Sequence, residues 1–172
     1  MVKPLIIIGT GRCIWGDFSK AKELVDSYDV MLVNHIIYTF PENAKHFCTL
    51  HPDWYRSYRG HWQGREVPHQ HFAKSYPEIR AACSGLFATW VGITLGYDRI
   101  MLVGMPMDDS GHYYDPPDHK GCYAHYLPMM AEWQQDAPLW HDKVKSFAGK
   151  TKQWLGEPTE EWLYGLQKRT GT

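Results

Sequence analysis

The stretch Leu5-Ile6-Ile7-Ile8-Gly9-Thr10-Gly11-Arg12 decides the fold that we expect for this chain. Consecutive large apolar residues, most of them β-branched, are typical of a strand that is buried on both faces of a parallel sheet. We place this strand at Lys3 to Ile8, and the glycines at positions 9 and 11 end it sharply. Because such a sheet needs helices on both faces, the sequence predicts an α/β protein.

The segments that follow repeat the pattern of strand and helix. Ser19 is a candidate cap for a helix that stops near Tyr28, because apolar residues recur behind it at helical spacing. The runs Asp29 to Asn34 and Ala44 to Leu50 predict two more strands, the second of them ended by His51-Pro52. Short intervals of this kind imply right-handed crossovers between parallel neighbours. We therefore expect a single Rossmann-like α/β domain, with a mostly parallel sheet flanked by helices.

The second half of the chain continues in the same way after an interruption. Residues 54–80 are rich in Gly, Pro, His and Arg and show little periodicity, so we expect an irregular insertion there. Ser84-Gly85 precedes an apolar helix over Leu86 to Leu95, which Gly96 ends, and Arg99 to Gly104 predicts another buried strand. The remaining expected elements are a helix at 124–135, a strand at 143–147 and short helices at 151–155 and 159–166.

Length and composition are those of one globular domain over residues 1–172. The net charge is -1 and basic residues form no stripe, which does not favour duplex nucleic acid as a partner. The apolar runs are too short to cross a membrane and no signal segment opens the chain, so we expect a cytoplasmic protein without a membrane partner. Aromatic residues make up 15% of the chain, including eight Trp, and this surplus is our reason to expect a homo-oligomer.

Neither the cysteines nor the clustered histidines predict a metal centre. The four cysteines are widely spaced and form no CxxC pair, which indicates reduced and mostly buried thiols. A His-x-His pair can place two imidazoles on one ion, but no clear fourth ligand accompanies His61, His69 and His71.

Polar residues gather where the predicted strands end. Gly9 to Arg12 follow the first strand, Asn34 follows the second, His51 the third, and Asp108 to His112 a later one. In an open parallel sheet, ligands bind beyond the carboxyl ends of the strands, where the order of the strands reverses. We therefore expect these residues to form a nucleotide-binding site at that edge.

The glycine loop and the start of the apolar helix are the two candidate phosphate-binding segments. Gly9-Thr10-Gly11 would let backbone amides approach a phosphate, and Arg12 could form a fork on its oxygens. The loop lacks the third glycine of the dinucleotide fingerprint, so a tight turn without a ligand is an equal alternative. Ser84-Gly85 could likewise present amides to an anion, or could simply cap the helix.

Asp108 and His112 are the candidate catalytic residues. Asp108, with Asp109, could bind Mg²⁺ together with a nucleotide's phosphates, hold a ribose or act as a base; the alternative is a solvated acidic turn. We prefer His112 to His119 as the acid or base, since imidazole titrates near neutral pH.

A longer pattern covers residues 84–108: Ser84-Gly85-Leu86-Phe87-Ala88, then Leu95-Gly96-Tyr97-Asp98-Arg99-Ile100, then Leu102-Val103-Gly104 and Asp108. It resembles the segment shared by bacterial sialyltransferases of the lipooligosaccharide type and the domain family that contains archaeal 6-hydroxymethylpterin diphosphokinase. Ile8-Gly9-Thr10-Gly11, with Asn34 and His51, is similar to the glycine loop, strand-end Asn and later His of these proteins. Together the similar segments cover about half the chain.

The resemblance implies a Rossmann-like transferase that binds a nucleotide-activated sugar or a nucleoside triphosphate. It implies that the glycine loop and Asn34 hold the nucleotide, that Ser84-Gly85 lines the same cleft, and that Asp108 lies beside the reacting phosphates or ribose. The chain departs from the pattern where Arg12-Cys13 replaces the usual Pro-Ser, and where Pro106-Met107 precedes the acid.

Two functions of different classes follow. The first is a small nucleotide-dependent transferase that moves a glycosyl or diphosphoryl group, with Asp108 or His112 assisting an incoming hydroxyl. The second is a non-catalytic protein that captures a nucleotide or a nucleotide signal, with Trp and Tyr side chains stacking on the base. A purely structural role, in which the aromatic residues mark an assembly surface, is a third alternative.

Overall fold

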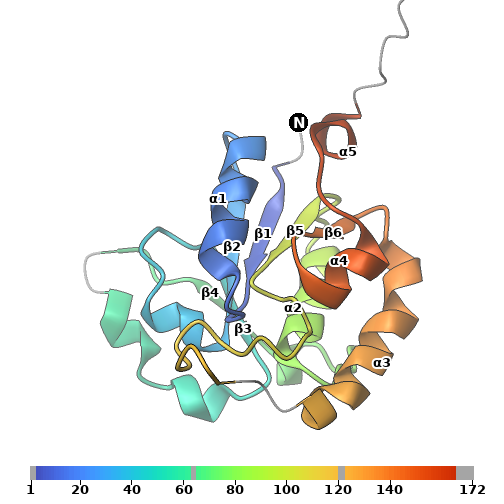
Figure 1. Ribbon diagram of the computed structural model, residues 1–172. Helices are drawn as coiled ribbons and strands as arrows, with labels where there is room; N and C mark the ends of the chain where they lie inside the picture. The colour runs from blue at the N-terminus through green and yellow to red at the C-terminus, as the bar shows by residue number, and fades with distance from the viewer. Residues whose placement is uncertain (1–2, 63–64, 120–122, 166–172) are drawn as a thin grey trace, which may run out of the picture.

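The strands of the protein join in one parallel sheet. The computed structural model describes residues 3–62, 65–119 and 123–165. Its strands are β1 (Leu5–Ile8), β2 (Asp29–Val33), β3 (His46–Thr49), β4 (His69–Phe72), β5 (Ile100–Val103) and β6 (Val144–Ser146). They lie side by side in the order β4-β3-β2-β1-β5-β6 (Figure 1). The predicted parallel pairing of the first two strands is confirmed by the register of Leu5 opposite Asp29.

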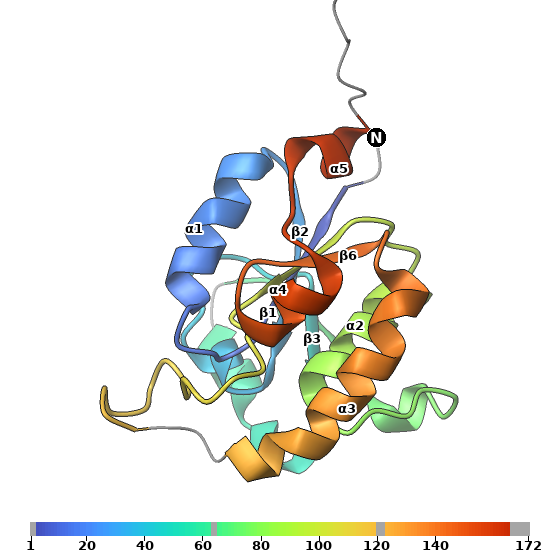
Figure 2. The same cartoon turned by 45° about the vertical axis from the view of Figure 1, so that its right-hand side comes forward.

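Helices cover both faces of this sheet. They are α1 (Ile14–Leu24), α2 (Ser84–Thr94), α3 (Tyr123–Trp140), α4 (Gly149–Leu155) and α5 (Glu160–Tyr164), with 3-10 helices η1 (Asn34–Tyr38), η2 (Pro52–Tyr55), η3 (Tyr58–Trp62) and η4 (Ala73–Ser75). One hydrophobic cluster joins the sheet to α1, η1 and η3, and the other joins it to α2, α3 and Leu155 of α4. Figure 2 shows α1 and α2 on opposite sides of the sheet. This is the predicted Rossmann-like α/β class. In the described part of the chain, no helix has both the length and the apolar character needed to cross a membrane.

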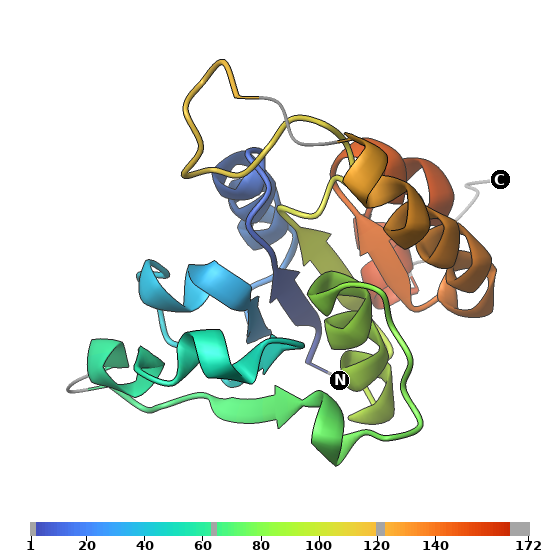
Figure 3. The same cartoon turned by 90° about the horizontal axis from the view of Figure 1, so that it is seen from below.

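The order of the strands reverses at β1. From β1 the chain moves through β2 and β3 to the edge strand β4, then returns through α2 to β5 on the other side of β1. The loops that follow β1 and β5 therefore leave in different directions and open a crevice between them. Figure 3 views the molecule from the side of these strand ends.

The first helix begins earlier than the sequence predicts. Ser19 is not its cap, because α1 begins at Ile14 and Ser19 lies exposed in its middle. The buried stripe of the helix consists of Ile14, Phe18 and Ala21, so it already starts ahead of Ser19. The helix also ends at Leu24, four residues before the predicted stop.

The insertion at 54–80 contains a strand that we did not predict. β4 pairs in parallel with β3, and His69 lies opposite His46. Its sequence, His-Gln-His-Phe, is not an apolar run. The strand lies at the partly exposed edge of the sheet, and hydrogen bonds hold its buried residue, His71. The segments around it form single 3-10 turns, as the lack of periodicity indicates.

Two other helix boundaries differ from the prediction. The cap of α2 is Cys83 rather than Ser84, because Cys83 Sγ accepts a hydrogen bond from Leu86 N (3.5 Å) and Ser84 is already helical. Helix α3 continues beyond the predicted end at 135. Both Trp133 and Trp140 are buried on its inner side, so packing carries the helix beyond residue 135 and through Pro138.

Candidate functional site

A cavity of about 380 Å³ opens at the carboxyl ends of β1, β2, β3 and β5. It lies where the strand order reverses, and its size is that of a small-molecule site. The loops after the strands, the start of α2 and one side of α3 form its walls. The sequence-predicted residues that line it are Gly9, Thr10, Gly11, Asn34, His51, Ser84, Gly85, Asp108 and His112.

The glycine loop packs tightly on the end of β5. Amides of the loop already donate to backbone carbonyls, namely Gly9 N to Val103 O (2.8 Å), Gly11 N to Gly104 O (2.7 Å) and Arg12 N to Gly111 O (3.1 Å). A Cβ on Gly11 would lie 2.5 Å from Pro106 Cδ, and one on Gly9 would lie 2.7 Å from Gly104 O. Close packing therefore requires both glycines, and the loop offers few free amides to a phosphate.

Arg12 lies outside the cavity lining and holds the loop that follows β5. Its guanidinium donates to three carbonyl oxygens, those of Ser110 (2.8 Å), Pro116 (2.8 Å) and His119 (3.3 Å). The predicted fork on phosphate oxygens is thus occupied by backbone carbonyls. An antiparallel bridge between Gly11 and His112 joins the same two loops, so Arg12 helps to place His112 at the cavity.

Asn34 follows β2 and presents an amide to the cavity. Thr49 Oγ1 donates to Asn34 Oδ1 (2.8 Å) and itself accepts from His51 N (3.0 Å). Because the oxygen of the Asn34 amide is engaged in this way, its N–H groups are the part left for a ligand acceptor. The pair therefore turns a strand-end asparagine into an oriented hydrogen-bond donor.

The start of α2 supplies a second polar wall. Ser84 is buried, and its Oγ accepts a hydrogen bond from Leu50 N (3.1 Å), which leaves the hydroxyl proton for a ligand. Gly85 packs close to Met105, whose sulfur would lie 2.9 Å from an added Cβ. The positive end of the helix dipole at Ser84 and Gly85 favours an anionic group there.

Backbone strain marks two places in the lining. Among the described non-glycine residues, only Asn34 (φ 59°) and Met107 (φ 51°) have left-handed backbones, and both line the cavity. Such a conformation costs about 1–3 kcal/mol and tends to occur at functional sites. Met107 immediately precedes Asp108, whose Oδ1 accepts from Ser110 N (3.0 Å). The strained turn therefore sets the position of the acid.

His112 is the half-buried imidazole of the site. Its backbone N donates to Asp115 Oδ2 (2.7 Å), which fixes the turn. Burial lowers the pKa of His112, with the Asp115 carboxylate opposing that effect. The imidazole is therefore neutral at pH 7 and can accept a proton. In the described residues, its ring nitrogens make no hydrogen bond with protein, so they stay available.

Aromatic rings form the rim, and sequence reasoning missed most of them. His51 stacks on Trp54 with ring centroids 4.4 Å apart, and the Trp54 side chain is 68% exposed. Tyr55 OH lies 3.0 Å from His35 Nδ1, and Tyr114 lies beside both His35 and His112. The signal for His35 was its position directly after a strand-end Asn. Residues 54 and 55 were hidden in the insertion that we treated as irregular.

Helix α3 closes the cavity with Tyr126, Met129 and Trp133. Their spacing of three and four residues places them on one side of the helix. This pattern was readable in the sequence, but an apolar stripe on a helix predicts burial without saying that it borders a cavity.

The lining carries little charge. Among the described residues that line it, Asp108 is the only carboxylate and none is Lys or Arg. Within the described ranges, no group of three or more His, Cys, Asp or Glu is placed to hold a metal ion. The candidate metal triad is dispersed, because His71 is buried on β4 whereas His69 is exposed on the same strand and His61 lies in η3. The site therefore offers amides, hydroxyls and neutral rings rather than a cationic cradle.

Comparisons of the chain with models of known families, with curated proteins and with solved structures found no match.

Proposed function

We propose that the cavity binds a nucleotide or nucleotide-activated sugar, and that the protein is a small transferase that moves a group from this donor to a hydroxyl. One observation carries the proposal: residues singled out because they follow separate strands line a single cavity where the strand order reverses. The resemblance of residues 84–108 to nucleotide-dependent transferases supports the same class.

The lining suits a flat base and a group with a small negative charge. Trp54 and Tyr114 are exposed at the rim and offer faces for stacking. Asn34 N–H and the Ser84 hydroxyl, at the positive end of α2, offer donors to phosphate or sugar oxygens. Asp108 would contact a Mg²⁺ ion that accompanies the phosphates, and this ion would supply the positive charge that the described lining side chains do not carry.

In the transfer step, His112 accepts the proton of the incoming hydroxyl. The hydroxyl oxygen forms a bond to the transferred group, and the bond between that group and the donor's phosphate oxygen breaks, leaving its electron pair with the nucleotide. A positioned base of this kind contributes about 10²- to 10⁴-fold to the rate. The polar lining holds the donor and the incoming hydroxyl in position to react, and this positioning further increases the rate.

A binding and turnover panel tests the proposal. The protein is incubated with nucleotide-sugars and nucleoside triphosphates, each with and without Mg²⁺, while thermal stability and released nucleotide are measured. We expect a ligand at a hundred times its Kd to stabilise the protein by about 2.7 kcal/mol, and nucleotide to be released. Asp108→Asn should lower turnover, and Asp109→Asn, which changes an exposed neighbour, is the matched control.

Capture without reaction is the alternative that the same panel separates. The aromatic rim and the oriented Asn34 amide are binding features that need no chemistry. A thermal shift with the ligand recovered unchanged, alike for the unmodified protein and Asp108→Asn, would favour capture. The absence of any shift across the panel would reject both functions.

A further inference from the structure

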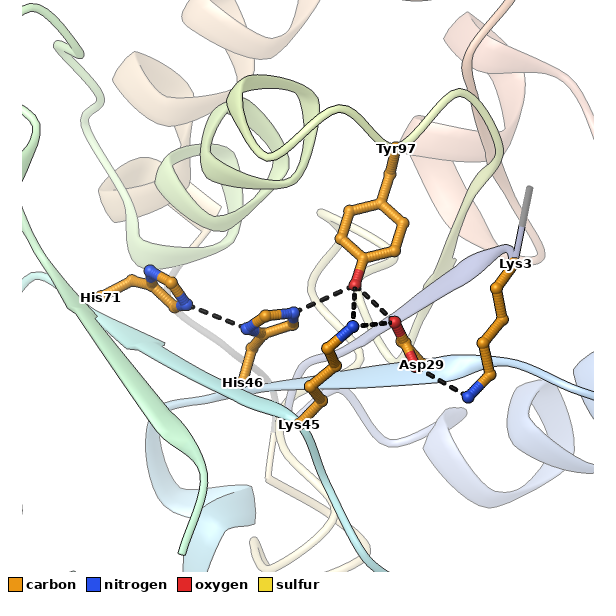
Figure 4. A network of polar contacts seen from close by, with 6 residues as sticks. All are labelled: Lys3, Asp29, Lys45, His46, His71 and Tyr97. Carbon is orange, nitrogen blue, oxygen red and sulfur yellow. Dashed lines mark hydrogen bonds and ion pairs between the residues drawn. The ribbon is translucent and has the colours of Figure 1, made fainter.

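A chain of buried polar side chains crosses the opposite edge of the sheet, at the amino ends of its strands. It joins Asp29 at the start of β2, His46 at the start of β3, and His71 on β4 (Figure 4). Tyr97, in the turn between α2 and β5, lies between Asp29 and His46 in this chain. All four residues are buried. The cavity proposed as the active site uses none of them.

The hydrogen bonds of this chain have one consistent direction. Tyr97 OH donates to Asp29 Oδ2 (2.6 Å), so its oxygen accepts from His46 Nε2 (3.0 Å). Because the pKa values of both imidazoles are lowered, both rings are neutral at pH 7, so His46 Nδ1 accepts and His71 Nε2 donates to it (3.0 Å). His71 Nδ1 is left to accept from Tyr76 OH (2.6 Å). All four ring nitrogens of the two histidines are therefore engaged.

The charges around the chain oppose an additional proton. Lys3 Nζ lies 2.8 Å from Asp29 Oδ1 and Lys45 Nζ lies 2.6 Å from Asp29 Oδ2, so two ammonium groups face one carboxylate. Lys45 Nζ also reaches Tyr97 OH (3.3 Å). The other titratable groups that act on the network are His69 on β4, Cys48 on β3 and Glu78 beyond η4. Among them only the single carboxylate of Glu78 would attract a proton, and it acts on the Tyr76 end.

The closed network offers few nitrogen atoms that can accept an added proton. A first proton can settle on His71 Nδ1 if the Tyr76 hydroxyl turns from donor to acceptor, at the cost of burying an imidazolium. A second proton, on His46 Nδ1, would set two N–H groups against each other across the 3.0 Å contact with His71. Protonation of both rings therefore requires the contact between β3 and β4 to open.

The edge position of β4 makes that opening local. Among the described strands, β4 pairs with β3 alone, through the register His46–Thr49 on His69–Phe72, so its release breaks one ladder and leaves the rest of the sheet paired. Release brings His71 into water, where an imidazolium is well solvated. We infer that β4 is an acid-released edge strand, held at neutral pH by the hydrogen bond between His71 and His46 and freed when this pair takes up protons.

The electrostatics of the two rings agree with this inference. Burial lowers the pKa of His71, and burial together with the neighbouring cations lowers the pKa of His46 to about 4. Both rings therefore bind protons more weakly in the closed sheet than in water, where their ordinary value is 6.5. By linkage, the equilibrium constant for opening rises as pH falls, up to tenfold per pH unit for each proton taken up.

Amide hydrogen exchange of the full chain between pH 7 and pH 5, expressed as protection factors, tests the inference. We expect β4 amides to be less protected than those of β1 at every pH, and their protection to fall by more than tenfold per pH unit below pH 6.5. His71→Gln can keep a hydrogen bond to His46 without taking up a proton. This variant should reduce the pH dependence of β4 protection by about a factor of ten per pH unit. His69→Gln, on the same strand but exposed, should leave the slope unchanged. Protection of β4 that is independent of pH, or equal to that of β1 throughout, would overturn the inference.

Imidazole ¹⁵N spectra of the unmodified protein give a second readout that does not depend on a folded variant. At pH 7 we expect both His46 and His71 to be neutral with the proton on Nε2, and a scalar coupling to be visible across the hydrogen bond between His71 Nε2 and His46 Nδ1. A protonated pair at pH 7, or a proton on His46 Nδ1, would show that the chain does not run as described.

Discussion

The two edges of one sheet use histidine in opposite ways. At the carboxyl edge, His112 lies in a loop beside the cavity, and its ring makes no hydrogen bond within the described residues. At the amino edge, His46 and His71 lie on strands and have every ring nitrogen engaged. A histidine that transfers protons to a ligand needs a free nitrogen, whereas a saturated one stabilises the fold. The number of unused ring nitrogens therefore distinguishes a reactive histidine from a structural one more sharply than burial does.

The largest expected effect is on turnover at the carboxyl edge. His112→Gln should reduce turnover of the donor identified by the panel by about 10²- to 10⁴-fold, because the base is lost while the loop remains. The Kd for the donor and the free energy of unfolding should change little, since the ring makes no hydrogen bond within the described residues. His119→Gln, in the same loop, is the matched control. Unchanged turnover in His112→Gln would exclude this histidine as the base.

The amino edge should instead control how stability depends on pH. The folded pKa of His46 is about 4 and its ordinary value is 6.5, so between these pH values the unfolded chain binds more protons. The free energy of unfolding should therefore fall as pH drops from 6.5 to 4, by roughly 3 kcal/mol from this residue. The pKa of Asp29 is lowered to about 2, so its contribution is lost only at still lower pH.

Urea unfolding at pH 7, 5.5 and 4.5 measures this dependence. His46→Gln should flatten the curve, and His112→Gln should change it less. If the unmodified protein unfolds with the same free energy at all three values, the two edges do not differ in the way described.

A single hydroxyl should separate the two edges in stability at neutral pH. Tyr97→Phe removes a group that contacts Asp29 and His46, and should lower the free energy of unfolding by about 2 kcal/mol. Tyr114→Phe, at the exposed rim of the cavity, should change it by less than about 0.5 kcal/mol. Chemical denaturation of both variants at pH 7 makes the comparison, and equal losses would contradict it.

Two glycine substitutions test whether close packing holds the glycine loop at the carboxyl edge. Gly11→Ala should destabilise the protein by about 1–3 kcal/mol, because the added Cβ would lie 2.5 Å from Pro106 Cδ. Gly16→Ala, in the first turn of α1 with nothing within 4 Å of an added Cβ, should stabilise by about 0.5–1 kcal/mol. Thermal unfolding checks both. A harmless Gly11→Ala would mean that the loop is not held by its packing on β5.

The sequence was informative about the carboxyl edge and nearly silent about the amino edge. Buried strands such as Leu5–Ile8 are recognisable as apolar runs, and in a parallel sheet the residues after each of them must meet at one edge. Asn34 and Asp108 could therefore be assigned to one site before its walls were known. β4 could not be predicted, because its polar residues are as typical of a loop as of an edge strand. His71 is held by His46 on β3 and by Tyr76 just after η4, and spacing along the chain does not reveal this pairing.

Arg12 is the residue for which sequence and structure differ most. As a phosphate ligand, Arg12 would act mainly by its charge, and Lys would conserve that charge. As the clamp on residues 110–119, it acts by a fork of donors to three carbonyls, which Lys cannot reproduce. Arg12→Lys should therefore weaken ligand binding by about tenfold, roughly 1.4 kcal/mol, by loosening the loop that carries Tyr114, which is proposed to stack on the base. Isothermal titration at two ionic strengths decides between the roles. If the Kd is unchanged in Arg12→Lys but rises steeply with salt, Arg12 acts as a phosphate ligand. If binding is weaker in Arg12→Lys and has the same salt dependence as in the unmodified protein, Arg12 acts as the clamp.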